Sequence, residues 1–149
     1  MPNPSLLRVF VDADVLYRAT SASHQATASL AVLHLGQATV LEVVTARYTL
    51  EEALCNLNQR SPALAMDLLN LAKESVEVVE SPPASVISRF VGQAHPKDLP
   101  NLAAAVQADA HMLLTFNGRD YYPPPKLIRV MTPGDLVLRV RNTVAGLAV

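Results

Sequence analysis

Four acidic residues lie in four separate segments of the chain, next to apolar runs or at the starts of helix-like runs. They are Asp12, Glu52, Asp98 and Asp120. Asp12 follows the apolar segment 6–11, and Asp120 lies in a loop beyond the apolar segment 111–115. In a parallel sheet, the carboxyl ends of the strands and the starts of the helices that follow them share one edge. We therefore expect the four carboxylates to converge at that edge.

These four carboxylates form a ligand set that suits a hard divalent cation. Carboxylates crowded together raise one another's pKa unless a cation neutralises them. Oxygen-only ligand sets favour Mg²⁺ or Mn²⁺, and the four histidines and single cysteine show no zinc-ligand spacing. Two such ions about 3.5–4 Å apart can activate a water and stabilise the leaving oxygen of a phosphodiester. The pattern therefore indicates metal-dependent cleavage of a nucleic-acid backbone.

Polar residues close to the acids are expected to support this site. Asp14 comes two residues after Asp12 and is expected to bond to the loops of the site or to cap the following helix. Thr115 ends an apolar run, where it is placed to orient a carboxylate or a water, and Asn117 lies in the loop beyond it. The cations that flank the same edge, and that we expect to bind phosphate, are Lys97 and Arg119.

Three of the acids also have a purely structural interpretation. Thr49 and Glu52 have the spacing of a capping box, in which the glutamate only completes the start of a helix. Asp98 precedes Pro100 at an expected helix start, where a carboxylate is favourable whatever its function. Asp12 could cap the next helix, but an aspartate that ends a buried strand is costly without a further role.

Apolar runs alternate with helix-like segments along the chain. The expected strands cover residues 6–11, 39–44, 76–79, 111–115 and 127–131. Strands that alternate with helices favour a parallel sheet covered on both faces. The chain has 149 residues, without an internal repeat or a low-complexity linker. We therefore expect residues 1–149 to form a single α/β domain.

Composition limits the classes of protein that this sequence can belong to. Half of the residues are hydrophobic and 17% are charged, which argues against disorder. The net charge of −1 gives no global positive field, so local cations and a bound metal must attract a nucleic acid. The N-terminal residues do not resemble a signal peptide, and the apolar runs are shorter than a membrane span. We expect a cytoplasmic protein without a membrane partner.

Four segments resemble, in order, the motifs of the PIN-domain nucleases. Residues 9–16 (VFVDADVL) resemble the opening strand of that family, and residues 50–57 (LEEALCNL) resemble its second acidic helix. Asp98 with the Ala-rich run 102–105 resembles the third acid and its helix. Residues 108–121 (ADAHMLLTFNGRDY) resemble the closing strand and loop. Together the matches span about residues 7 to 131.

This resemblance implies a three-layer α/β/α sandwich with a central parallel sheet of four to five strands. It implies a divalent-metal ribonuclease that acts on RNA and forms a homodimer, and many bacterial members are toxins paired with a small antitoxin. The catalytic and metal-binding acids would be Asp12, Glu52, Asp98 and Asp120. The family often has an acid where Asn117 stands, and an amide is a weaker Mg²⁺ ligand, so Asp120 would supply the charge instead.

Two other functions remain open. Asn117 is compatible with a PIN-like module of weak or absent activity that binds RNA or a protein. The run Asp12-Ala13-Asp14 also matches the nucleophile and general acid of haloacid dehalogenase-type phosphatases. That class also needs a lysine and a later acidic pair, and neither follows convincingly after Thr45. The chain is also short for the phosphatase fold with its usual cap domain.

Overall fold

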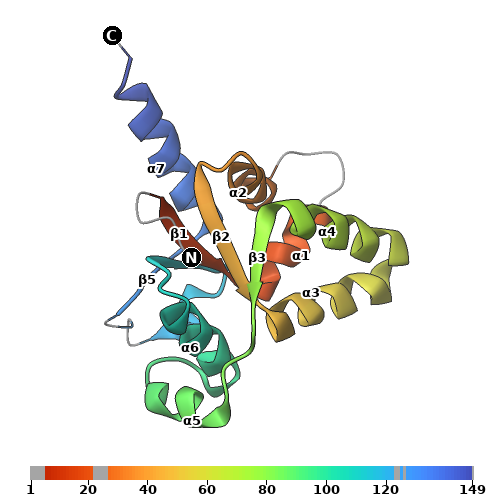
Figure 1. The fold of residues 1–149 in the computed structure, drawn as a ribbon, viewed down its shortest axis with the longest axis vertical. Helices are drawn as coiled ribbons and strands as arrows, with labels where there is room; N and C mark the ends of the chain where they lie inside the picture. Colours follow the sequence, from red (N-terminus) through yellow and green to blue (C-terminus); the bar gives the residue numbers. More distant parts are fainter. Residues whose placement is uncertain (1–5, 22–26, 123–124, 126, 149) are drawn as a thin grey trace.

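Five parallel strands form one central sheet in the computed structural model, which describes residues 6–21, 27–122, 125 and 127–148 (Figure 1). The order across the sheet is β3-β2-β1-β4-β5. The strands are β1 (Leu7–Val11), β2 (Leu41–Ala46), β3 (Val76–Val79), β4 (Met112–Leu114) and β5 (Arg129–Met131). The predicted parallel sheet is therefore confirmed.

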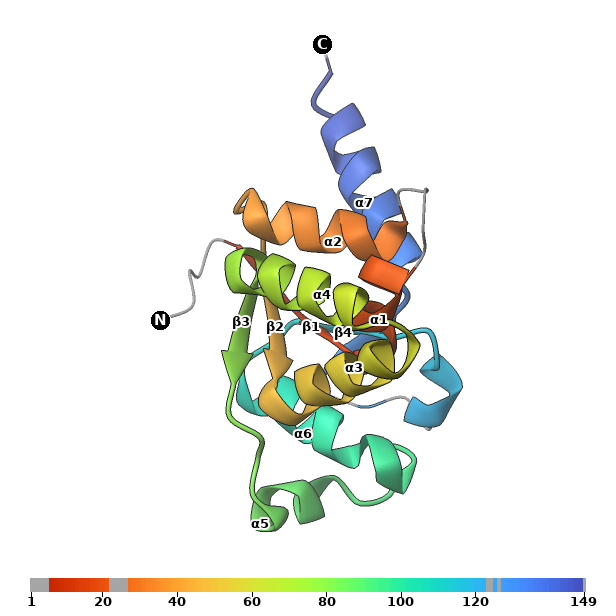
Figure 2. The same ribbon diagram turned by 90° about the vertical axis from the view of Figure 1, so that its right-hand side faces the viewer.

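Helices connect the strands and cover both faces of the sheet (Figures 1 and 2). They are α1 (Ala13–Ser21), α2 (Ala28–Gln37), α3 (Arg47–Arg60), α4 (Pro62–Ser75), α5 (Ala84–Ile87), α6 (Leu99–Gln107) and α7 (Pro133–Ala145). Single 3₁₀ turns cover Ser88–Phe90, Pro96–Asp98 and Gly118–Tyr121. In the described part of the chain, none of these helices has the length and apolar character required to cross a membrane.

The alternation of side chains along β1 creates the two cores. Successive residues of a strand point to opposite faces, so Val9 and Val11 join one buried cluster and Phe10 joins the other. The first cluster is completed by α1, α2, α3, α4 and α7, and the second by α6 with the 3₁₀ turns Ser88–Phe90 and Gly118–Tyr121. The result is the expected α/β/α sandwich.

The start of β2 differs from the expected strand at residues 39–44. Thr39 has a φ of 58°, and its amide donates to the carbonyl of Gly36 at 3.1 Å. A residue in this left-handed conformation closes the end of a helix and cannot continue a strand. The strand therefore begins at Leu41.

The start of α3 corrects the predicted capping box. The helix begins at Arg47, and its N-cap, Ala46, has no side-chain cap bond. Thr49 lies inside the first turn, fully buried, where its hydroxyl donates to the side-chain carbonyl of Asn101 at 2.6 Å. The structural explanation for Glu52 is therefore wrong, because the helix starts too early for Thr49 to cap it.

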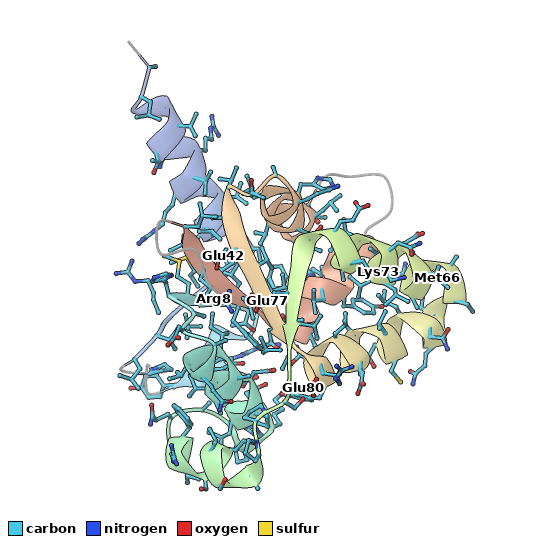
Figure 3. The ribbon with its side chains drawn as sticks, in the orientation of Figure 1. Arg8, Glu42, Met66, Lys73, Glu77 and Glu80 are labelled. Carbon is cyan, nitrogen blue, oxygen red and sulfur yellow. The ribbon has the colours of Figure 1, made fainter. Side chains whose placement is uncertain are left out.

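Two ion pairs made by the buried Arg8 join three strands at their amino-terminal ends. Arg8 of β1 contacts Glu42 of β2 at 3.0 Å and Glu77 of β3 at 2.7 Å (Figure 3). Its Nε also donates to the carbonyl of Ala108 at 2.6 Å. These contacts stabilise the register at the edge of the sheet that lies opposite the predicted site.

Candidate active site

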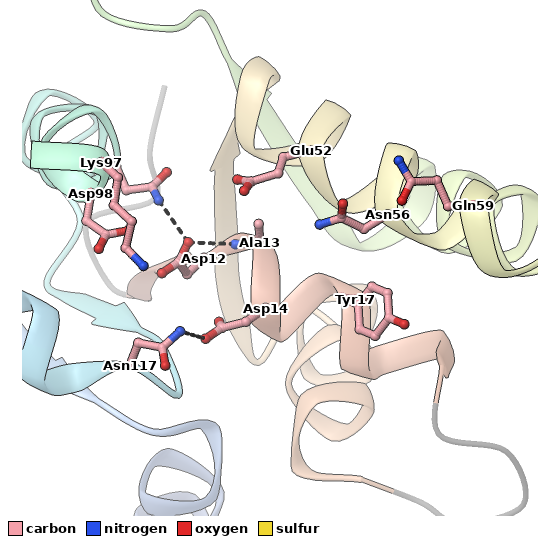
Figure 4. A pocket seen from close by; sticks show the side chains of 11 residues that line it. Asp12, Ala13, Asp14, Tyr17, Glu52, Asn56, Gln59, Lys97, Asp98 and Asn117 are labelled. Atoms are coloured by element: carbon pink, nitrogen blue, oxygen red, sulfur yellow. Dashed lines mark hydrogen bonds between the residues drawn. The ribbon is translucent and has the colours of Figure 1, made fainter.

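A cavity of about 510 Å³ opens at the carboxyl-terminal edge of the sheet (Figure 4). It lies where β1 passes into α1, between α3 on one side and the start of α6 on the other. Its charged and amide residues from the predicted site are Asp12, Asp14, Glu52, Lys97, Asp98 and Asn117. Three of the four predicted acids thus meet at one cavity, together with Asp14.

Asp12 lies at the base of this cavity and is only 6% exposed. Its Oδ1 accepts hydrogen bonds from the amide of Ala13 at 2.7 Å and from Nδ2 of Asn101 at 2.8 Å. Its Oδ2 accepts from the hydroxyls of Thr115 at 2.9 Å and Tyr121 at 3.3 Å. Burial raises the pKa of Asp12, although bonds from Ala13, Thr115 and Tyr121 favour its charged form. Its carboxylate is therefore held in one orientation.

Asp14 joins the first turn of α1 to the loop after β4. Its Oδ2 accepts from the amide of Phe116 at 3.0 Å and from Nδ2 of Asn117 at 3.1 Å. Its Oδ1 is buried and has no hydrogen-bond partner among the described residues. Burial, and then the charge of Asp12, raise the pKa of Asp14 to about 6. The group therefore has a free oxygen in a place where a negative charge is costly.

Asp98 precedes α6, but its side chain makes no cap bond to any residue that the structure describes. Its Oδ2 is buried and likewise lacks a partner there. Burial and then Asp12 raise the pKa of Asp98 to about 6, against the opposing effect of Lys97. Asp98 therefore does not cap α6 through a hydrogen bond, although its charge lies at the start of that helix.

Glu52 faces the same cavity from α3, although it is an exposed residue. Burial of part of the carboxylate, and then the charge of Asp12, raise its pKa, while Lys97 lowers it. The acid on α3 is therefore electrostatically coupled to the acid at the end of β1.

Asp120 occupies a different position from the other predicted acids. It is absent from the described residues that line the cavity, and its carboxylate lies 3.4 Å from Nζ of Lys97. Its charge still contributes to the raised pKa of Asp98. Arg119, in the same 3₁₀ turn, is exposed and is likewise not among those lining residues.

Asn101 is a site residue that was not predicted from the sequence. It is 2% exposed, and its side-chain carbonyl accepts from the hydroxyls of Tyr48 at 2.8 Å and Thr49 at 2.6 Å, while its amide donates to Asp12. It comes three residues after Asp98, so both side chains lie on one face of the helix start. That spacing was the one sequence signal that could have identified it.

The donor set of the cavity fits a hard divalent cation in its chemistry. Carboxylate oxygens predominate, and two of them, Oδ1 of Asp14 and Oδ2 of Asp98, are buried without a partner among the described residues. As placed, however, no group of three or more His, Cys, Asp or Glu side chains in the described ranges could hold a metal ion. Coordination by three of these acids would therefore require side chains to move.

Comparison with known proteins identifies similar structures. A scan against protein-family models and a search of curated proteins found no match. PAE2754 from Pyrobaculum aerophilum matches with a TM-score of 0.64 and 19% identity, over 94% of this chain and 99% of that chain. VapBC2 from Rickettsia felis, bound to a promoter DNA fragment, matches with a TM-score of 0.61 and 12% identity, over 85% and 98% of the respective chains.

A third similar structure is Mycobacterium tuberculosis VapC20, described as a toxin that cleaves the sarcin–ricin loop. Its TM-score is 0.56 at 16% identity, and the match covers 81% of this chain and 98% of that chain. At these identities the matches show a shared fold. They cover nearly the whole length of each neighbour, so the fold is shared over almost all of those chains.

Proposed function

We propose that this chain, whose fold is that of the PIN-domain toxin nucleases, is a ribonuclease that uses Mg²⁺ or Mn²⁺ to hydrolyse RNA phosphodiester bonds. The observation that carries the proposal is the cavity in which Asp12, Asp14, Glu52 and Asp98 face one another. Burial and mutual repulsion make these negative charges costly unless a cation joins them. Such a cost is typical of a functional site.

Each group around the cavity has a role in this proposal. Asp12, Asp14, Glu52 and Asp98 would hold the ion, which when bound would supply Lewis acidity and a water of lowered pKa. Asn101, Thr115 and Tyr121 fix the orientation of Asp12 through their hydrogen bonds.

Lys97 lines the cavity and is the proposed contact for an RNA phosphate. Its ion pair with Asp120 would keep the ammonium group beside the acids, so Asp120 would act through Lys97 or through a water. Arg119 is proposed to contact the RNA backbone farther from the reacting phosphate, since it is exposed on the same 3₁₀ turn as Asp120.

A protein partner is part of the proposal. VapC20, one of the similar structures, is described as a toxin, which supports a small antitoxin as a partner of this chain. Exposed apolar residues on α7, among them Leu138 and Val144, support a contact with an antitoxin or with a second copy of the chain. We place the activity in the cytoplasm, where RNA substrates are found.

The test is cleavage of end-labelled single-stranded RNA by the whole chain in Mn²⁺, in Mg²⁺ and in EDTA. We expect cutting with either ion, none in EDTA, and a loss of about 100-fold or more in Asp12→Asn. Asp67→Asn removes the same charge from the exposed face of α4 and should cut like the wild type.

Four results would count against the proposal. Cutting that persists in EDTA, or an Asp12→Asn variant that remains fully active, would exclude a metal-dependent reaction centred on Asp12. If the wild type binds Mn²⁺ and RNA without cutting, the inactive binding module is the better description. Hydrolysis of p-nitrophenyl phosphate that depends on Asp12 would instead favour the phosphatase alternative.

A further inference from the structure

The cavity that holds the acids also has an uncharged polar wall. Tyr17 of α1 and Asn56 and Gln59 of α3 line it together with the carboxylates (Figure 4). Asn56 and Gln59 come four and seven residues after Glu52, so these three side chains share one face of α3. A helix rises about 1.5 Å per residue, which places Asn56 about 6 Å and Gln59 about 10 Å beyond Glu52 along the axis.

The same division occurs on α1. Tyr17 comes three residues after Asp14 and therefore lies on the same face, one turn farther from the sheet. Both helices thus carry an acid near the sheet edge and neutral polar groups beyond it. The cavity passes from a strongly acidic end to an end that is polar but uncharged.

The polar groups of this wall are available to a ligand. Within the described ranges, the amide of Asn56 and the hydroxyl of Tyr17 make no side-chain hydrogen bond. The amide of Gln59 has only a long contact, 3.9 Å, with the sulfur of Cys55. A contact of that length to sulfur is weak, so all three groups can exchange water for a ligand.

We propose that this wall binds the unpaired base of the nucleotide next to the bond that is cut, and that it sets the base preference of the enzyme. The inference rests on the proposed ribonuclease function. A carboxamide offers a donor and an acceptor side by side, which matches the edge of a nucleobase. The ring of Tyr17 offers a face on which such a base can stack.

The charge distribution makes the same wall a poorer site for a phosphate than for a base. Among the described lining residues, the single Lys or Arg is Lys97, which lies beside Asp98 at the acidic end. A phosphate at Asn56 and Gln59 would therefore lack a cation, whereas a base carries no charge that needs one. The volume of about 510 Å³ lies within the range of about 300–1,000 Å³ that is typical of small-ligand sites, enough for one nucleotide.

The test compares cut sites in a single-stranded RNA library with a random central region, read by sequencing, in Mn²⁺. The wild type should favour one base on one side of the cut. Asn56→Ala/Gln59→Ala should lower this preference at least about fivefold, the loss expected when a base-edge contact is removed. Asn58→Ala, on the same helix but outside this cavity, should keep the wild-type preference.

A wild type that cuts without base preference, or a double variant that keeps it, would overturn the inference while leaving the ribonuclease proposal intact. If the wild type does not cut at all, the proposed function fails and binding decides the inference. Fluorescence anisotropy with four labelled six-nucleotide RNAs, each of one base, would then be measured for both proteins. Affinity that differs between bases only in the wild type supports the base site, and equal affinities refute it.

Discussion

At the scale of single residues, the acid at the base of the cavity depends on an amide that connects the sheet with the helices on both of its faces. Asn101 donates to Asp12 and accepts from Tyr48 and Thr49, so one buried side chain joins α6, β1 and α3. Because Asn101, Asp12 and Thr49 are buried, losing the bonds among them leaves polar atoms unsatisfied.

Asn101→Ala should therefore lower the free energy of unfolding by about 1–3 kcal/mol. It should also reduce RNA cleavage by about 10- to 100-fold, because Asp12 loses a bond that fixes its orientation. Urea unfolding and cleavage rates would be measured beside Asn70→Ala, an exposed asparagine on α4 that should change neither. A fully active and equally stable Asn101→Ala would remove Asn101 from the site.

Asn117 is the residue at which the sequence departs from the PIN-domain pattern, and it donates a hydrogen bond to Asp14. Asn117→Asp would replace this donor with a like charge, which should destabilise the metal-free protein by about 1 kcal/mol. With Mn²⁺ bound, Asn117→Asp should instead stabilise the protein, since the added carboxylate is a stronger ligand than an amide. Melting temperatures in EDTA and along a Mn²⁺ titration would measure both effects.

The matched control is Asn58→Asp, which adds the same charge on α3 outside the acidic cavity. It should leave the midpoint of the Mn²⁺ titration unchanged. An Asn117→Asp midpoint equal to that of the wild type would mean that position 117 does not contribute to ion binding.

At the scale of elements, α2 packs unusually close to the sheet and to the end of α4. A Cβ added at Gly36 would lie 2.6 Å from the carbonyl oxygen of Ser75 and 2.8 Å from Cγ2 of Val43. Replacing a helical glycine with alanine normally stabilises a helix by about 1 kcal/mol. Here the backbone of α4 cannot yield easily, so the steric clash should exceed that gain.

Gly36→Ala should consequently lower the free energy of unfolding by about 1–3 kcal/mol, as overpacking does in other cores. Gly134→Ala in α7 is the control, because its nearest atom would lie at 3.8 Å, an ordinary contact. Chemical denaturation would measure the free energy of unfolding of both variants. Equal values for Gly36→Ala and Gly134→Ala would mean that α2 can shift away from α4 without loss of stability.

Periodicity predicted the elements better than their ends. The five strands and the parallel sheet followed from apolar runs that alternate with helix-like segments. The start of α3 was not predicted correctly. Threonine is a better N-cap residue than alanine, which favoured Thr49 over Ala46, but the hydroxyl of Thr49 bonds to Asn101 instead. A tertiary contact of this kind leaves no local trace in the sequence.

The site was predictable where topology alone decides position. Asp12 ends β1, and Glu52 and Asp98 lie near helix starts, so the sheet edge brings them together. Asp120 lies in a short 3₁₀ turn after β4, whose position is set by contacts such as the bond from the amide of His95 to the carbonyl of Asp120 at 2.6 Å. Asp14 was expected only to support the site, but it lines the cavity because the first turn of α1 directs it there.

At the scale of the whole molecule, the acids make stability depend on pH. The pKa of Asp14 and of Asp98 is about 6 in the folded protein, above the value of about 3.9 in an unfolded chain. The folded state therefore binds these protons more tightly. The contribution of these two protonated groups to the stability of the folded protein is fully present below about pH 4. It is lost as the pH rises through about 6.

In EDTA, raising the pH from 4 to 7 should lower the free energy of unfolding by about 1–2 kcal/mol through Asp14 and Asp98 together. This figure allows for solvent screening of the partly exposed carboxylates. Urea unfolding at several pH values would compare the loss of unfolding free energy in the wild type with the loss in Asp98→Asn. The variant should lose less stability over this pH range. Asp67→Asn should follow the wild type. Identical pH profiles for the wild type and Asp98→Asn would contradict the raised pKa of Asp98.

The single cysteine of the chain gives this molecule a built-in attachment point for an optical probe. Cys55 is exposed on α3, adjacent to Asn56, and its sulfur lies 3.9 Å from the amide of Gln59. A thiol-reactive fluorophore would therefore label one position only, beside the uncharged wall of the cavity. Its emission could report in real time when a ligand enters the cavity, without any mutation of the protein.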